Sequence, residues 1–127
     1  MKLLVVDDSS IIRKIIKAAA DVLRMETMEA QDGIEALEKL SGHYREIDLV
    51  LLDWNMPEMS GYDVLVEIKN SDLYKHIPVM MVTTEGQKSH IVSAVRAGAD
   101  NYLTKPFTVE QLQSKIAECI GEEGDDY

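Results

Sequence analysis

The chain has 127 residues, 46% hydrophobic and 28% charged, with a formal net charge of −10. This length suits one folded domain, and the acidic balance disfavours nucleic acid and anionic membranes as partners, because both would be repelled. No apolar stretch approaches the roughly 18 residues of a membrane span, and the N-terminal apolar run is too short for a signal peptide. Cys119 is the only cysteine, which excludes an internal disulfide and favours a reducing compartment. We therefore expect a cytoplasmic protein.

Five short segments have the composition of strands. Residues 3–6 and 49–52 are wholly apolar, which predicts strands that are covered on both faces in the middle of a parallel sheet. Residues 25–30, 77–82 and 100–103 are the other strand candidates, and Pro78 is tolerable near the start of its run.

A helical pattern follows each of these segments. Ser9 or Ser10 can cap the first helix, Asp32-Gly33 opens the second and Ser41-Gly42 ends it, and Gly98 ends the fourth. Two pairs have the spacing of capping boxes, Ser60 with Asp63 and Thr108 with Gln111. The expected apolar faces, in chain order, are Ile11, Ile12, Ile15, Ile16, Ala19, Val22 and Leu23; Ile34, Leu37 and Leu40; Val64, Leu65 and Ile68; Ile91, Ala94 and Val95; and Leu112, Ile116 and Ile120.

Strand followed by helix, five times over, predicts an α/β fold. Such a chain forms a doubly wound, five-stranded parallel sheet with helices on both faces and right-handed crossovers. The chain shows no internal repeat and no linker, so we expect one domain over residues 1–120 and an acidic tail over 121–127.

Polar side chains stand where four of the strands end. Asp7 and Asp8, Asp53, Thr83 and Lys105 come at these ends, and in a parallel sheet the four ends lie along one edge, where ligands bind. Three neighbouring carboxylates repel one another, and a divalent cation relieves that repulsion. Oxygen ligands without cysteine or a histidine pair favour Mg²⁺. A lysine and a hydroxyl beside such a cation suit a phosphoryl group, which Asp53 could accept.

Each of these residues has an ordinary structural explanation when it is taken alone. An aspartate after a strand is commonly a turn or helix cap, Thr83 could cap a helix, and Lys105 before a proline could be solvated. Tyr102, when it is taken alone, would be a half-buried residue that serves only in packing. The coincidence of acids, a hydroxyl and an amine at four strand ends favours the functional interpretation.

The motifs that carry these residues resemble one known family. VVDDS at 5–9, LLDWNMPEMSG at 51–61, VTTE at 82–85 and YLTKPF at 102–107 are similar to the receiver domain of bacterial response regulators. The match covers nearly the whole chain. The resemblance implies a flavodoxin-like (βα)5 fold with strand order 2-1-3-4-5.

The resemblance also implies a role for each site residue. Asp53 would be the phosphoacceptor, and Mg²⁺ would be held by Asp7, Asp8, Asp53 and the backbone carbonyl of Asn55. Lys105 would pair with the phosphoryl group, and its bond to Pro106 is often cis in this family.

Further residues would make the domain a switch. Thr83 would move toward the phosphoryl oxygens and let Tyr102 turn inward, which re-forms the surface of the fourth helix, fifth strand and fifth helix where targets bind. Asn55 and Glu85 would tune the rate of dephosphorylation, and Thr84 is bulkier than the residue often found after the switch threonine. These positions are similar to those of chemotaxis regulators of the CheY type.

Three functions are compatible with these residues. The first is a single-domain response regulator without an output domain, phosphorylated by a chemotaxis histidine kinase, reset by a phosphatase and acting on the flagellar motor switch to change flagellar rotation. The second is a stand-alone phosphorelay intermediate that passes its phosphoryl group to a histidine phosphotransfer protein. The third is a Mg²⁺-dependent phosphohydrolase with an aspartyl nucleophile, which is disfavoured because such hydrolases carry a second Asp where this chain has Asn55. We therefore expect a phosphoacceptor signalling protein and not an enzyme.

Overall fold

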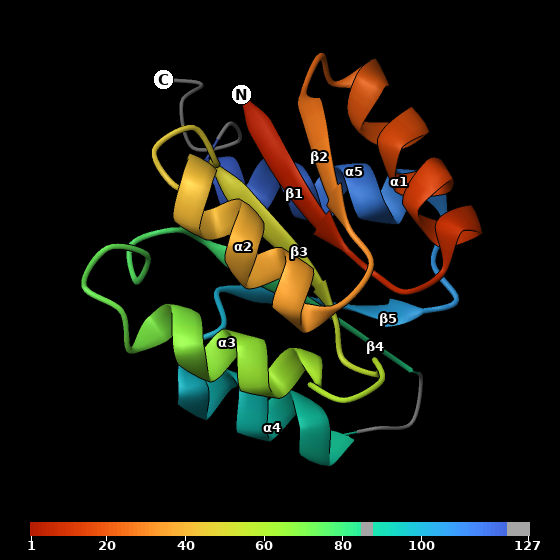
Figure 1. Cartoon of the computed structure of the whole chain (residues 1–127). Helices are drawn as coiled ribbons and strands as arrows, with labels where there is room; N and C mark the ends of the chain where they lie inside the picture. Colours follow the sequence, from red (N-terminus) through yellow and green to blue (C-terminus); the bar gives the residue numbers. More distant parts are fainter. Residues whose placement is uncertain (85–87, 122–127) are drawn as a thin grey trace.

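The computed structural model describes residues 1–84 and 88–121, and within them five strands alternate with five helices (Figure 1). The elements are β1 (Lys2–Val6), α1 (Ser10–Val22), β2 (Glu26–Ala30), α2 (Gly33–His43), β3 (Leu49–Asp53), α3 (Gly61–Lys69), β4 (Val79–Thr84), α4 (Lys88–Ala97), β5 (Asn101–Lys105) and α5 (Val109–Ile120). None of these helices is both long enough and apolar enough to cross a membrane.

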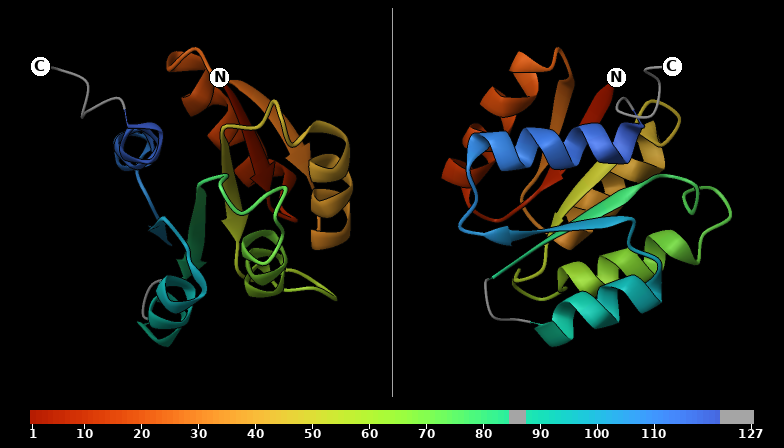
Figure 2. Two further views of the ribbon diagram at one scale, coloured as in Figure 1. Left: turned by 90° about the vertical axis from the view of Figure 1, so that its left-hand side faces the viewer. Right: turned by 180° about the vertical axis from the view of Figure 1, so that it is seen from behind.

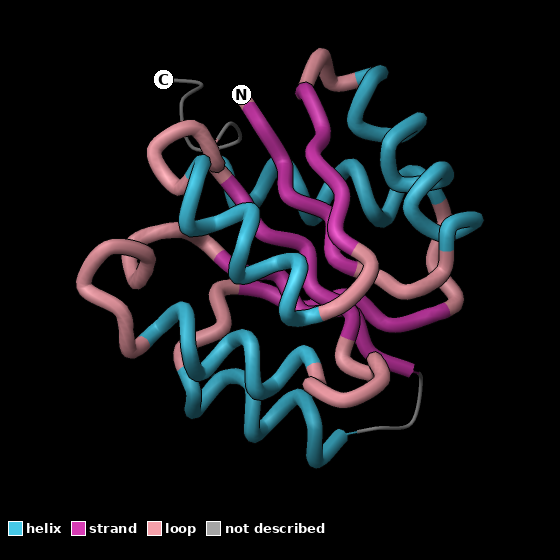
Figure 3. The backbone as a smooth tube through the Cα atoms, viewed as in Figure 1, coloured by secondary structure: helices cyan, strands magenta, loops and turns pink. Residues whose placement is uncertain are grey.

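The strands form one parallel sheet in the order β2-β1-β3-β4-β5. The sheet is the central layer of the molecule, as Figure 3 shows. One core cluster lies between the sheet and α1 with α5, and the other between the sheet and α2, α3 and α4 (Figure 2). The doubly wound fold and the strand order expected from the resemblance are both confirmed.

Burial of the strands follows the apolar pattern of the sequence. All five residues of β3 are buried, and so are Leu3–Val6 of β1. Both strands lie inside the sheet with helices on each side, which is why neither alternates polar with apolar residues. β2 is an edge strand and is only partly covered. β4 begins directly after Pro78 and continues through Thr83 and Thr84, two residues beyond the apolar run.

Side-chain caps fix where the helices begin. Ser9 accepts a hydrogen bond from the amide of Ile12 and Asp32 accepts one from Glu35, while Ser60 and Thr108 each form the predicted reciprocal capping box. At the end of α4, Gly98 has a φ of 103°, and the amide of the next residue, Ala99, donates to the carbonyl of Ala94 at 2.9 Å. A left-handed glycine that closes a helix in this way is a C-terminal cap, as predicted.

Ser41 and Gly42 do not end α2, contrary to the prediction. The helix runs through both residues to His43, and the amide of Tyr44 still donates to Leu40 at 2.9 Å. Tyr44 packs against the core and lies beside Tyr74, with ring centroids 5.5 Å apart. This tertiary contact holds the last turn in helical form and outweighs the propensity cost of one glycine.

The predicted apolar faces of the helices were too wide. Five of the listed residues are exposed: Ile11, Ile15, Val22, Ile34 and Val95. In α1 the buried stripe consists of Ile16, Ala19 and Ala20, because the two alanines bring the helix close to its neighbours and leave the flanking isoleucines outside. Helical periodicity identifies the direction of the core, but the width of the covered stripe depends on what the helix packs against.

Candidate functional site

The carboxyl ends of β1, β3, β4 and β5 meet at one edge of the sheet. Asp7 directly follows β1, and Asp53 ends β3 next to Val82 of β4. Carboxylate oxygens of Asp7, Asp8 and Asp53 all lie within 4.8 Å of one another. The structure therefore brings Asp53 together with Asp7 and Asp8, two neighbouring acids that lie 45 or more residues earlier in the chain.

Lys105 is the cation of this cluster. Its Nζ lies 3.1 Å from Oδ2 of Asp7 and 3.2 Å from Oδ1 of Asp53, and it donates a hydrogen bond to each. Both carboxylates are almost fully buried, whereas a quarter of the lysine side chain remains exposed. The Lys105–Pro106 peptide bond is cis, as the resemblance implied.

Burial and repulsion act together on Asp53. Desolvation and the neighbouring charge of Asp7 raise its pKa from 3.8 to about 6, even though Lys105 opposes both effects. Burial alone would lower the pKa of Lys105, but the charges of Asp53 and Asp7 leave it raised. One ammonium group therefore does not neutralise the cluster, and its remaining negative charge favours a second cation.

The donor set fits a hard divalent cation. Asp7, Asp8 and Asp53 offer only oxygen atoms, Asp8 is exposed, and no cysteine or histidine belongs to the group. Mg²⁺ prefers such carboxylate oxygens and keeps part of its water shell, which the exposed side of this cluster permits. The resemblance to receiver domains likewise implies Mg²⁺ at this acidic cluster. Asn55 lies exposed in the turn after β3, two residues beyond Asp53.

The turn after Asp53 depends on Gly61, the first residue of α3. The amide of Gly61 donates to the carbonyl of Trp54 at 2.8 Å, and a β-carbon at Gly61 would overlap the carbonyl oxygen of Asp53. The amide of Trp54 in turn donates to Val82 of β4 at 2.9 Å. The backbone behind Asp53 is thus packed too closely to admit any side chain.

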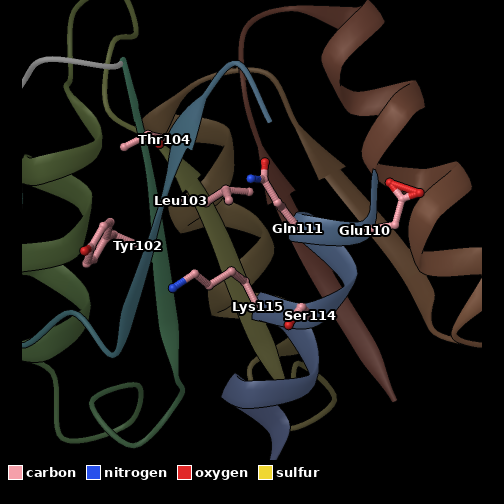
Figure 4. A pocket seen from close by; sticks show the side chains of 7 residues that line it. All are labelled: Tyr102, Leu103, Thr104, Glu110, Gln111, Ser114 and Lys115. Atoms are coloured by element: carbon pink, nitrogen blue, oxygen red, sulfur yellow. The ribbon is translucent and has the colours of Figure 1, made fainter. Parts of the chain in front are cut away.

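The two expected switch residues lie on neighbouring strands. Thr83 is buried, and its hydroxyl donates to the carbonyl of Thr84 at 3.0 Å. Tyr102 is 38% exposed, and the ammonium of Lys115 lies 5.2 Å from the centre of its ring. Figure 4 shows Tyr102 pointing away from the body of the sheet, with Lys115 extending from α5 toward it. Glu85 lies outside the described residues.

Two contacts around the cluster were not predicted from the sequence. Arg13 of α1 donates to the backbone carbonyl of Asp7, and the imidazole of His90 in α4 stacks on Trp54 with ring centroids 4.0 Å apart. Trp54 and His90 are 36 residues apart, and Arg13 is six residues from Asp7 but also pairs with Glu29, 16 residues away on β2; no local pattern marks either contact.

Comparison with known proteins identifies the family. The response regulator receiver domain family matches residues 3–117. Chemotaxis protein CheY1 of Helicobacter pylori is 44% identical over 122 residues, which cover 95% of this chain and 98% of the relative. Chemotaxis protein CheY of Pseudomonas aeruginosa is 44% identical over 117 residues, which cover 91% of this chain and 93% of the relative.

Solved structures agree with this assignment. Chemotaxis protein CheY4 of Vibrio cholerae has a TM-score of 0.85 at 32% identity and covers 93% of this chain and 97% of that one. A receiver domain protein of Clostridium thermocellum has a TM-score of 0.87 at 33% identity, with coverages of 97% and 96%. This chain therefore belongs to the response regulator receiver domain family, and it is a receiver domain of the CheY chemotaxis type.

Proposed function

We propose that this protein is a phosphorylation-switched binding module in the cytoplasm, with Asp53 as the phosphoacceptor and a chemotaxis histidine kinase as the donor. The observation that carries the proposal is the convergence of Asp53 with Lys105, Asp7 and Asp8 at one edge of the sheet. The protein acts as a signalling regulator that assists its own phosphorylation and dephosphorylation.

The side chains around Asp53 have distinct roles in this proposal. A carboxylate oxygen of Asp53 attacks phosphorus, the P–N bond to the donor histidine breaks as the new P–O bond forms, and the histidine nitrogen regains a proton. Lys105, now paired with Asp53 at 3.2 Å, transfers its ion pair to a phosphoryl oxygen. Asp7, Asp8, Asp53 and the carbonyl of Asn55 would hold Mg²⁺, which would neutralise charge at the phosphoryl oxygens.

In this proposal, phosphorylation of Asp53 affects the protein surface through Thr83 and Tyr102. Thr83 follows Val82, the strand partner of Asp53, and its hydroxyl can exchange the Thr84 carbonyl for a phosphoryl oxygen. This movement vacates the space into which Tyr102 turns from its exposed position. The result is a population shift between two packings of one domain, biased by one covalent charge.

A groove next to Tyr102 is the proposed output site. It has a volume of about 390 Å³, and its lining residues come from β5 and α5, two of the three elements of the expected output surface (Figure 4). The lining residues are Tyr102, Leu103, Thr104, Glu110, Gln111, Ser114 and Lys115. Inward rotation of Tyr102 would change one wall of this groove. The chemotaxis names of the relatives favour a flagellar motor switch protein as the target.

A second surface feature is compatible with the phosphorelay alternative. A mainly apolar hollow of about 440 Å³ lies directly beside Lys105 and is lined by Ile12, Ile15, Thr84, Pro106 and Phe107. Such a hollow suits a protein that presents its phosphohistidine to Asp53, and that protein could be the kinase or a histidine phosphotransfer protein.

Transfer and binding experiments separate these two functions. The protein would be phosphorylated by a labelled chemotaxis kinase and then mixed with a flagellar motor switch protein or a histidine phosphotransfer protein. Tighter binding to the switch protein after phosphorylation, with no loss of label to the phosphotransfer protein, supports the chemotaxis role. Rapid movement of label onto the phosphotransfer protein supports the relay, and failure of the kinase to label the protein contradicts both.

A further inference from the structure

Arg13 forms hydrogen bonds to residues at the ends of two neighbouring strands, β1 and β2. Its Nη1 donates to the backbone carbonyl of Asp7 at 2.6 Å, and its Nε donates to Oε1 of Glu29 at 2.9 Å. Glu29 lies near the end of β2, beside the turn that joins β1 to α1. Although Arg13 belongs to the first turns of α1, only 16% of its side chain is exposed. The guanidinium of Arg13 thus binds the carboxylate of Glu29 on β2 and the backbone carbonyl of Asp7, the residue that follows β1.

The carbonyl that Arg13 binds belongs to the peptide group between Asp7 and Asp8. The side chain of Asp7 is already fixed, because it accepts hydrogen bonds from the amide of Ser9 at 2.9 Å and from Lys105 at 3.1 Å. Asp8 is different: it is exposed, and within the described parts of the chain no hydrogen bond or ion pair holds its carboxylate. The direction of the Asp8 side chain is therefore set by its backbone, and Arg13 fixes the peptide plane that precedes it.

We infer that Arg13 is a positioning residue for Asp8 at the cation site, with Glu29 orienting the guanidinium. This inference rests on the Mg²⁺ site of the proposed function. Loss of a partner that orients a metal ligand from outside the coordination shell typically lowers metal affinity by roughly 10- to 100-fold. Arg13 suits this task because its planar fork can bind two acceptors in fixed directions, whereas a lysine would offer one compact charge.

The direction in which Mg²⁺ affinity changes when Arg13 is replaced distinguishes a positioning role from a purely electrostatic one. Arg13 is positively charged and lies next to a site for a cation, so its charge alone weakens Mg²⁺ binding. Replacing it with glutamine would then tighten binding if only charge mattered. If Arg13 positions Asp8, the same replacement weakens binding.

The choice of cation gives a second discriminating readout. Mg²⁺ demands near-ideal octahedral geometry at short distances, while Ca²⁺ accepts more irregular sets of oxygen ligands. Disorder in the direction of Asp8 should therefore reduce Mg²⁺ affinity more than Ca²⁺ affinity. A general loss of charge or of stability would not change the ratio of the two affinities in this way.

The test is calorimetric titration of the chelator-treated protein with MgCl₂ and, separately, with CaCl₂. We expect Arg13→Gln to raise the Kd for Mg²⁺ roughly tenfold and to lower the preference for Mg²⁺ over Ca²⁺. Lys17→Gln is the matched control, because it removes the same charge from the same helix at an exposed side chain that pairs with Asp21. This control should leave both affinities unchanged or slightly tighter.

A second variant tests the same contact without touching α1. Glu29→Gln leaves Arg13 in place but removes the carboxylate that orients it. Loss of this negative charge would by itself weaken the binding of both cations, so the discriminating result is a lower preference for Mg²⁺ over Ca²⁺, in the same direction as for Arg13→Gln. Thermal unfolding of each metal-free variant shows that it is folded. Mg²⁺ binding by Arg13→Gln or Glu29→Gln as tight as in the wild type would overturn the inference. If the wild-type protein itself fails to bind Mg²⁺, the metal site of the proposed function is wrong as well.

Discussion

The ammonium nitrogen of Lys105 lies 3.2 Å from Oδ1 of Asp53, although 52 residues separate the two in the chain. The same nitrogen reaches Asp7, so one lysine spans the carboxyl ends of two strands and itself ends a third. A compact ammonium group can move from a carboxylate to a phosphoryl oxygen on the same Asp53 without a large displacement. This relationship predicts how a conservative substitution should behave.

Lys105→Arg is expected to separate phosphorylation from switching. The planar guanidinium keeps the charge that assists phosphoryl transfer, but it cannot occupy the same small space between Asp7 and Asp53. We expect label from a phosphodonor to be retained, while the gain in target affinity on phosphorylation falls by about tenfold, or ~1.4 kcal/mol. Normal phosphorylation-dependent target binding, measured with the label quantified in the same sample, would contradict the role assigned to Lys105.

Thr83→Val should have a similar effect for a different reason. Valine keeps the shape of this buried threonine but removes the hydroxyl that now donates to Thr84. A charge-assisted hydrogen bond to a phosphoryl oxygen is worth roughly 1.5 to 3 kcal/mol, so the phosphorylated variant should bind its target at least tenfold more weakly than the phosphorylated wild type. Thr84→Val is the control at an exposed neighbour and should bind normally. Equal binding by the two variants would show that the Thr83 hydroxyl is not part of the switch.

The pKa of Asp53 predicts how stability depends on pH without metal. Its pKa is 3.8 in the unfolded chain and about 6 in the fold, so between these values the folded protein holds a proton that the unfolded chain releases. Stability from this group therefore falls as pH rises through that window, and the full penalty is present above about pH 6.

Asp53→Asn removes this penalty. In the presence of a chelator the variant should be more stable than the wild type by roughly 1 to 3 kcal/mol at about pH 7.5, and the difference should vanish near the lower pKa. Urea unfolding of both proteins across this pH range measures it. Addition of Mg²⁺ should reduce this difference in stability between the variant and the wild type, because the cation stabilises the site that contains the ionised Asp53. A difference that does not vary with pH would mean that Asp53 is not destabilised by its neighbours.

Two glycine substitutions test how tightly the fold holds the phosphoacceptor. Gly61→Ala places a β-carbon against the backbone carbonyl of Asp53 and should cost about 3 kcal/mol, since overpacking here can be relieved only by moving the backbone. Gly42→Ala is the matched change, because Gly42 lies in α2 with nothing near its missing side chain. It should stabilise the protein by up to about 1 kcal/mol. Chemical unfolding gives both values, and a neutral Gly61→Ala would mean that the turn after β3 is not rigid.

The strands, the helix starts and the polar residues at the strand ends could be predicted from the sequence, because each depends on short-range features. Buried parallel strands are recognisable from unbroken apolar runs such as Leu49–Leu52, and capping pairs such as Ser60 with Asp63 satisfy local backbone groups. Parallel topology then places Asp53 and Lys105 at the same edge. None of this requires knowledge of distant contacts.

The features that could not be predicted depend on contacts between distant elements. The width of the buried stripe on α1 follows from its packing against α5 and β2, so Ile11 and Val22 were assigned to the wrong side. The last turn of α2 is held by Tyr44, and the side chain of Arg13 pairs with Glu29 on β2, 16 residues away. Spacing along the chain carries no signal for such contacts.

Phosphorylation at Asp53 is the central claim, and localisation of the covalent adduct tests it most directly. The protein and Asp53→Asn would be incubated with acetyl phosphate and Mg²⁺ and then examined by intact and fragment mass spectrometry. The account predicts one phosphoryl group, stable in acid and labile in base, on Asp53 of the wild type and none on the variant. Equal labelling of the variant, or an adduct on another residue, would contradict it.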